Sequence, residues 1–151
     1  MLPVLATLDH LLRLNSDTVI ALSNHDETAW RAPDARGRHA LWILGHCAAY
    51  RHRILRLVDC EPPTTLWEAQ VLKGSHASGL SPSLRSLTFR EALLEAGDRL
   101  TQRFTEMDRA FWEGPFSGTL RDGSTTIGGA LRYLTYHETL HIGQIGFLLA
   151  N

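Results

Sequence analysis

The sequence predicts an all-α protein, and more narrowly a four-helix bundle with a long crossover between its second and third helices. Four segments carry apolar residues at a spacing nearer 3.6 than 2, which indicates amphipathic helices. One connection, from Cys60 to Leu87, lacks sustained periodicity and is rich in Ser, Gly and Pro. The chain has 151 residues, so residues 1–151 are expected to form a single domain with its own core.

The first helix is predicted from about Leu2 to Asn24. Pro3 suits its first turn, where the missing N–H of proline costs little. The segment WRAPDARGR interrupts the pattern, and the second helix is predicted from His39 to Val58. Its apolar stripe consists of Trp42, Ile43, His46, Tyr50, Ile54 and Leu57, while Arg51, Arg53 and Arg56 fall mostly off it.

A connection as long as Cys60–Leu87 is unusual in a small domain. A crossover explains the length of this connection: the chain would return along the bundle, so that the third helix runs parallel to the second. A short helical turn is expected within Leu66–Leu72. The third helix is predicted to open at Thr88, where TFRE forms a capping-box pattern, and to continue to Met107.

The link WEGPFSGTLRDGS contains Gly-Pro and Asp-Gly turn signals, and its alternating residues predict a short extended arm. The fourth helix is predicted to begin with Ser124 or Thr125 as N-cap and to end near Leu149. Its apolar stripe consists of Ile127, Leu131, Leu134, His137, His141, Ile145 and Leu148.

The composition excludes several classes of function. Apolar residues make up 44% of the chain and charged residues 21%, and the formal net charge of −1 predicts no nucleic-acid partner. No apolar run reaches the ~20 residues that span a bilayer, and the first residues lack a signal-peptide pattern. Cys47 and Cys60 are expected to be reduced, which predicts a cytoplasmic location.

Three of the eight histidines lie on predicted core-facing stripes. His137 and His141 are four residues apart and share one helix face, and His46 occupies the stripe of the second helix. A divalent metal shared by the three rings would satisfy nitrogens that burial otherwise leaves unpaired. Neutral imidazoles suit Zn, Ni, Fe(II) or Cu, and three protein ligands leave a position open for water or substrate. The other five are expected to be solvated or to act as caps: His10, His25, His39, His52 and His76.

The stretch HETLH matches the H-E-x-x-H motif of zinc proteases, in which the Glu is the general base. The following residues, IGQIGFLLAN, contain no Asp, Glu or His that could supply a third ligand, so we do not expect a protease. Glu138 lies at the margin of the stripe. It could reach a metal-bound water, hydrogen-bond a ligand histidine, or face solvent.

The segments LWILGHCAAYRHRIL and LRYLTYHETLHIGQIGFLLAN resemble those of the DinB-like (YfiT-type) metalloenzyme family. The order of features matches along nearly the whole chain. The resemblance implies an up-down-down-up four-helix bundle, a metal held by His46, His137 and His141, and a homodimer. Some relatives use low-molecular-weight thiols. Gln144 matches the family's H-x-G-Q pattern and is not expected to be a ligand.

Three functions remain open from the sequence. The first is a metal-dependent enzyme acting on a small molecule, as a thiol-dependent transferase or isomerase or as a hydrolase. The others are a non-catalytic metal- or ligand-binding bundle and a structural dimer module. Tyr50, Arg53 and Tyr133 are candidates for binding an anionic substrate. Four aromatic residues in the links are candidates for a dimer interface: Trp67, Phe111, Trp112 and Phe116.

Overall fold

The computed structural model describes residues 1–72 and 74–150, and within these ranges the protein is all-helical, as the sequence predicts. The described residues form six α-helices: α1 (Pro3–Ala21), α2 (Glu27–Arg31), α3 (Ala40–Leu57), α4 (Ser86–Glu106), α5 (Arg109–Glu113) and α6 (Ile127–Leu149). They also form the short 3₁₀ helices η1 (Leu22–Asn24), η2 (Glu68–Gln70) and η3 (Ala77–Gly79). The expected extended arm is present as an isolated antiparallel bridge between Pro115 and Thr126.

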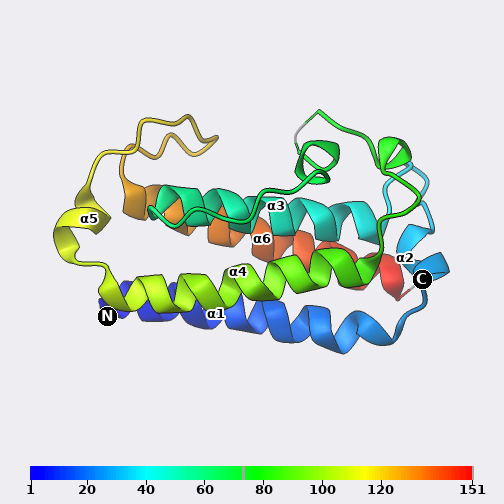
Figure 1. Ribbon diagram of the computed structural model, residues 1–151, viewed down its shortest axis with the longest axis horizontal. Helices are drawn as coiled ribbons and strands as arrows, with labels where there is room; N and C mark the ends of the chain where they lie inside the picture. The colour runs from blue at the N-terminus through cyan, green and yellow to red at the C-terminus, as the bar shows by residue number, and fades with distance from the viewer. Residues whose placement is uncertain (73, 151) are drawn as a thin grey trace.

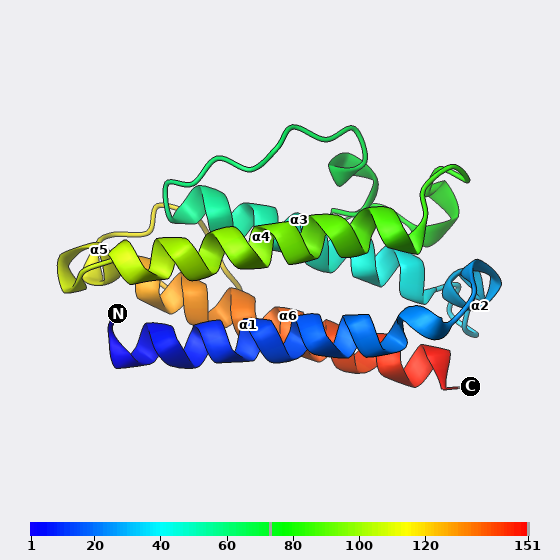
Figure 2. The same cartoon turned by 60° about the horizontal axis from the view of Figure 1, so that its bottom comes forward.

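The four long helices α1, α3, α4 and α6 lie side by side (Figure 1). Colour along the ribbon shows that α1 and α6 run in one direction and that α3 and α4 run in the other (Figure 2). Because α3 and α4 run in the same direction, the segment between them returns along the length of the molecule. Among the described residues, no helix combines the length and apolarity needed to cross a membrane.

Two helix starts differ from the prediction. The N-cap of α6 is Thr126, whose hydroxyl accepts from the Gly129 N–H, so this helix starts slightly later than expected. The prediction that α4 opens at Thr88 is wrong, because α4 begins at Ser86. The Glu27 carboxylate of α2 accepts from the Ser86 N–H at 2.8 Å and so caps α4 from a distant part of the chain.

The interior is divided into two apolar clusters by a polar layer. One cluster includes Val19 and Ile142, and the other includes Leu12 and Leu134. Between them, on the same helices, lie Asn15 of α1 and Glu138 of α6, which are buried. Arg51 of α3 completes the layer with a fully buried side chain. The expectation that Arg51 falls off the core-facing stripe is therefore wrong.

Arg51 connects all four long helices through its five N–H donors. Its guanidinium donates two hydrogen bonds to the Glu138 carboxylate, at 2.7 and 2.9 Å. The remaining donors reach acceptors on α1 and α4: the Leu12 carbonyl, the Ser16 hydroxyl and the Leu93 carbonyl. A buried charge pair is tolerated when its donors and acceptors are all engaged, as they are here.

Gly97 of α4 provides the space for this guanidinium. A Cβ atom at this position would lie 2.6 Å from Nη1 of Arg51. Glycine inside a helix costs roughly 1 kcal/mol relative to alanine. At Gly97 that cost is offset by the room it gives to Arg51.

The aromatic residues chosen as interface candidates pack against the core. Trp67 is buried in the first apolar cluster. Phe111, Trp112 and Phe116 are partly buried against the second cluster, and the Trp112 ring lies directly over Gly128. These side chains pack on the apolar core, so they give no support to the predicted homodimer.

Candidate metal centre

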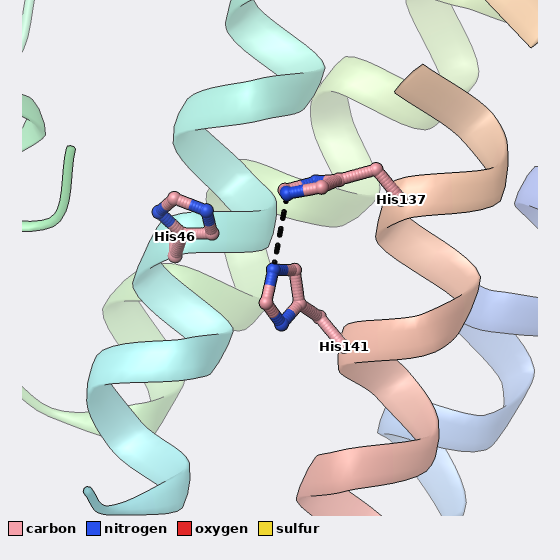
Figure 3. Close-up of side chains that lie close together, drawn as sticks. All are labelled: His46, His137 and His141. Carbon is pink, nitrogen blue, oxygen red and sulfur yellow. Dashed lines mark hydrogen bonds between the residues drawn. The ribbon is translucent and has the colours of Figure 1, made fainter. Parts of the chain in front are cut away.

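Three histidines meet where α3 and α6 face each other (Figure 3). His46 comes from α3, and His137 and His141 come from α6, one helical turn apart. Each ring offers one nitrogen, and these three atoms all lie within 4.8 Å of one another. The structure thus brings together the three residues that the sequence pattern selected as metal ligands.

The outward nitrogens of two rings are held by oxygen acceptors. Nδ1 of His46 lies 2.6 Å from the Val71 carbonyl oxygen, and Nδ1 of His141 lies 2.8 Å from Oε1 of Gln144. A carbonyl oxygen can only accept, so each Nδ1 carries the proton and each Nε2 keeps a free lone pair. Metal-ligating histidines are usually oriented by such a hydrogen bond on the opposite nitrogen.

The third ring leaves a polar atom without a partner. Nε2 of His137 faces Nε2 of His141 at 3.2 Å, and Nδ1 of His137 is buried with no hydrogen-bond partner among the described residues. Two lone pairs that face each other repel unless a proton or a cation lies between them. Two nitrogens bound to one tetrahedral zinc lie about 3.3 Å apart, since each Zn–N distance is about 2.0–2.1 Å. The donor set therefore fits a divalent transition metal.

The surroundings keep the three imidazoles neutral, which is the form that binds metals. Burial lowers the pKa of His46 and of His141 below the ordinary value for histidine. Burial lowers the pKa of His137 to about 4, together with the repulsion that a protonated His137 would meet from the cationic forms of His141 and His46 and from Arg53. A cluster of neutral nitrogen donors at neutral pH is thus built into the fold.

The crossover positions His46 from outside the four long helices. Gly45 permits the crossover to approach α3 closely, because a Cβ atom on Gly45 would lie 2.8 Å from Cγ1 of Val71. Val71 is fully buried and presents its carbonyl to His46. One turn earlier, the Trp42 ring stacks on His46 and donates its indole N–H to the Gln70 carbonyl at 3.1 Å. The long connection therefore has a role that helix spacing alone does not reveal.

A cleft of about 440 Å³ opens beside the histidines. Its walls come from α3, α6, the crossover and the link between α5 and α6, which lie on the same side of the molecule in Figure 1. The lining residues are Trp42, His46, Tyr50, Arg53, Gly74, Thr119, Leu120, Arg121, Tyr133 and His137. The sequence pattern had suggested Tyr50, Arg53 and Tyr133 as substrate-binding residues, and all three line the cleft. It had not suggested Arg121.

The remaining histidines divide into three groups. His10, His25 and His76 are exposed, as expected. His39 is the N-cap of α3, where its Nδ1 accepts from the Trp42 N–H. The expectation for His52 is wrong, because its side chain is buried against the Trp67 ring. It lies 3.4 Å from the Glu68 carboxylate and helps to hold the crossover on α3.

Glu138 neither reaches the histidine site nor faces solvent, so none of the three roles expected from the sequence applies. Its side chain is 0% exposed, and its hydrogen bonds go to Asn15 and Arg51 rather than to a site histidine. A protease base must reach a metal-bound water, whereas this carboxylate is bonded to Asn15 and Arg51 in the protein interior. The glutamate of HETLH thus has a structural role here.

The fold and the site together define an all-helical protein with a candidate three-histidine metal centre. A family model described as the DinB superfamily matches residues 10–145, and the chain belongs to this superfamily. Comparisons with curated proteins and with solved structures gave no significant match.

Proposed function

We propose that the protein is a metal-dependent enzyme acting on a small molecule, built on an up-down-down-up four-helix bundle. His46, His137 and His141 hold one divalent transition metal, with Zn, Ni and Fe as the candidates. The observation that carries the proposal is the convergence of three neutral ring nitrogens, two of them oriented by Val71 and Gln144. A bound metal would supply a Lewis acid, or lower the pKa of a coordinated water or thiol.

The cleft supports a small-molecule reaction rather than proteolysis. A volume of about 440 Å³ accommodates a metabolite-sized ligand, at the lower end of the usual range for small-molecule sites. Tyr50 packs against two of the site rings, with its ring centroid 4.5 Å from that of His46 and 4.5 Å from that of His137. All three rings line the cleft. We propose that the reaction is either a hydrolysis, or a transfer or isomerisation that uses a low-molecular-weight thiol as the second substrate.

A thiol-consumption screen tests the proposed reaction. Zinc-loaded protein is mixed with a low-molecular-weight thiol and a panel of electrophiles, and the remaining free thiol is measured. We expect consumption by the wild type, loss of that activity in His137→Ala, and wild-type rates in His10→Ala, whose side chain is exposed in α1. Equal rates in wild type and His137→Ala would contradict the proposal. Metal binding without any turnover would favour the non-catalytic alternative.

The homodimer and the cytoplasmic location remain proposals. Tyr136 and Leu140, which are 60% and 50% exposed, give α6 an apolar outer surface on which a second copy could pack. Light scattering at micromolar protein concentration should give twice the chain mass, and a monomer mass would refute the dimer.

The proposed cytoplasmic location rests on the cysteines. Cys47 and Cys60 are both free, which agrees with a reducing compartment.

A further inference from the structure

We propose that the cleft beside the three histidines binds an oxyanion, the carboxylate or phosphate group of a small organic molecule, through Arg53 and Arg121. The inference deepens the proposed function and rests on it in one respect, namely that the bound anion is the substrate of the histidine site. Binding of the anion itself does not require that the site be catalytic. The two claims can therefore fail separately.

The charge of the cleft supports an anionic ligand. Arg53 and Arg121 both line it, and none of its described lining residues is an Asp or a Glu. Elsewhere in the protein, arginines pair with carboxylates, as Arg38 does with Asp34 and Arg56 with Glu68. No such ion pair involves Arg53 or Arg121 among the residues that the structure describes. Two uncompensated guanidinium groups beside neutral imidazoles create a site that attracts negative charge.

Arg53 is held close to the histidines. It lies one turn after Tyr50 on α3, and its guanidinium carbon is 5.7 Å from the centroid of the Tyr50 ring. That ring stacks on His137 with a centroid separation of 4.5 Å. An acidic group bound by Arg53 would therefore place the rest of a small molecule next to the site histidines.

Arg121 is presented by an anchored turn. Its neighbour Leu120 is buried against the core, and the Gly123 N–H donates to the Leu120 carbonyl at 3.0 Å. Gly123 has a φ of +74°, a conformation that glycine adopts at low cost. The adjacent acid, Asp122, accepts hydrogen bonds from Ser124. Within this turn the Asp122 carboxylate is bonded to Ser124 and forms no ion pair with Arg121 among the described residues. The Arg121 guanidinium can therefore bind a ligand.

Arginine suits this ligand class because its planar fork of N–H donors matches the geometry of carboxylate and phosphate oxygens. The ligand is small, since the whole cleft is about 440 Å³. A molecule with two acidic groups could engage both arginines at once. The structure thus favours a compact organic acid or phosphate over a neutral or cationic substrate.

Calorimetric titration with succinate, inorganic phosphate and the neutral succinamide tests the inference, on metal-free and zinc-loaded protein. We expect at least one anion to bind and succinamide not to bind, and the tighter anion identifies the acidic group. Arg53→Gln and Arg121→Gln should each weaken binding about tenfold or more, because each removes charge-assisted hydrogen bonds. Arg109→Gln is the matched control, since Arg109 is exposed and lies close to Glu113. It should bind like the wild type.

Two results would overturn the inference: no binding of either anion to the wild type, or an affinity that is unchanged in both arginine variants, whether or not the binding needs zinc. Circular dichroism confirms the fold of each variant. Arg121 is exposed in a link, so its variant keeps the test valid if Arg53→Gln does not fold. Anion binding by protein that takes up neither zinc nor nickel nor iron would refute the proposed function and leave the anion site standing.

Discussion

Replacing Glu138 by glutamine is expected to lower the free energy of unfolding by about 3–5 kcal/mol, which is the usual cost of removing one partner from a buried ion pair. The carboxylate is 0% exposed and accepts two hydrogen bonds from Arg51 and one from Asn15. Glutamine keeps the shape but leaves the Arg51 charge without its counter-ion. Urea denaturation followed by circular dichroism measures the change.

Glu95→Gln is the matched control for this prediction. Glu95 is exposed on α4, so its replacement should alter stability by less than about 0.5 kcal/mol. A second comparison is the double variant Arg51→Met/Glu138→Leu, which removes both charges and should recover much of the lost stability. If Glu138→Gln were as stable as Glu95→Gln, the ion pair would not be a structural element of the core.

The same variant separates the two interpretations of HETLH. Because Glu138 binds Arg51 and not a site histidine, the folded fraction of Glu138→Gln should bind zinc like the wild type. The wild type should not cleave an unstructured protein such as casein. Zinc-dependent cleavage that disappears in Glu138→Gln would restore the protease interpretation.

Zinc is expected to stabilise the protein through the histidine site. A metal that binds only the folded state, at one hundred times its Kd, adds about 2.7 kcal/mol to the free energy of unfolding. Thermal denaturation with and without zinc should show this increase for the wild type and for His10→Ala. His137→Ala should show none, because it lacks a nitrogen that faces His141 at 3.2 Å. Equal stabilisation of both variants would place the metal elsewhere.

The site histidines could be found from the sequence because helical periodicity determines which residues share a face. His137 and His141 are one turn apart on α6, and His46 continues an apolar stripe on α3. The pattern does not reveal which residues from other elements pack beside them. The Val71 carbonyl reaches His46 from the crossover, and Arg121 reaches the cleft from a turn. Neither the crossover nor this turn has a periodic pattern of apolar residues that would predict its position.

The ion pair of Arg51 and Glu138 was missed for a related reason. Each residue taken alone is a charged side chain on an amphipathic helix, where exposure is the usual outcome. Their burial depends on a contact between residues 87 positions apart and on the space at Gly97. A glycine in the middle of a helix was the available signal, since it often marks a close approach.

The short helices α2 and α5 have a local start signal in the sequence. Asp26 and Asp108 cap them, each accepting from the N–H three residues later at 2.8 Å. An Asp before a short run containing an aromatic residue is a recognisable helix start. The start of α4 was not predictable in this way, because its cap comes from Glu27, 59 positions away.

Zinc stoichiometry by equilibrium dialysis tests the central claim most directly. Wild type, the variants His46→Ala, His137→Ala and His141→Ala, and the control His10→Ala are dialysed against the same free zinc concentration, and metal and protein are quantified in each. We predict one zinc ion per chain for the wild type and the control, and little or none for the three variants. Full occupancy in all three variants would show that these histidines are not the ligands.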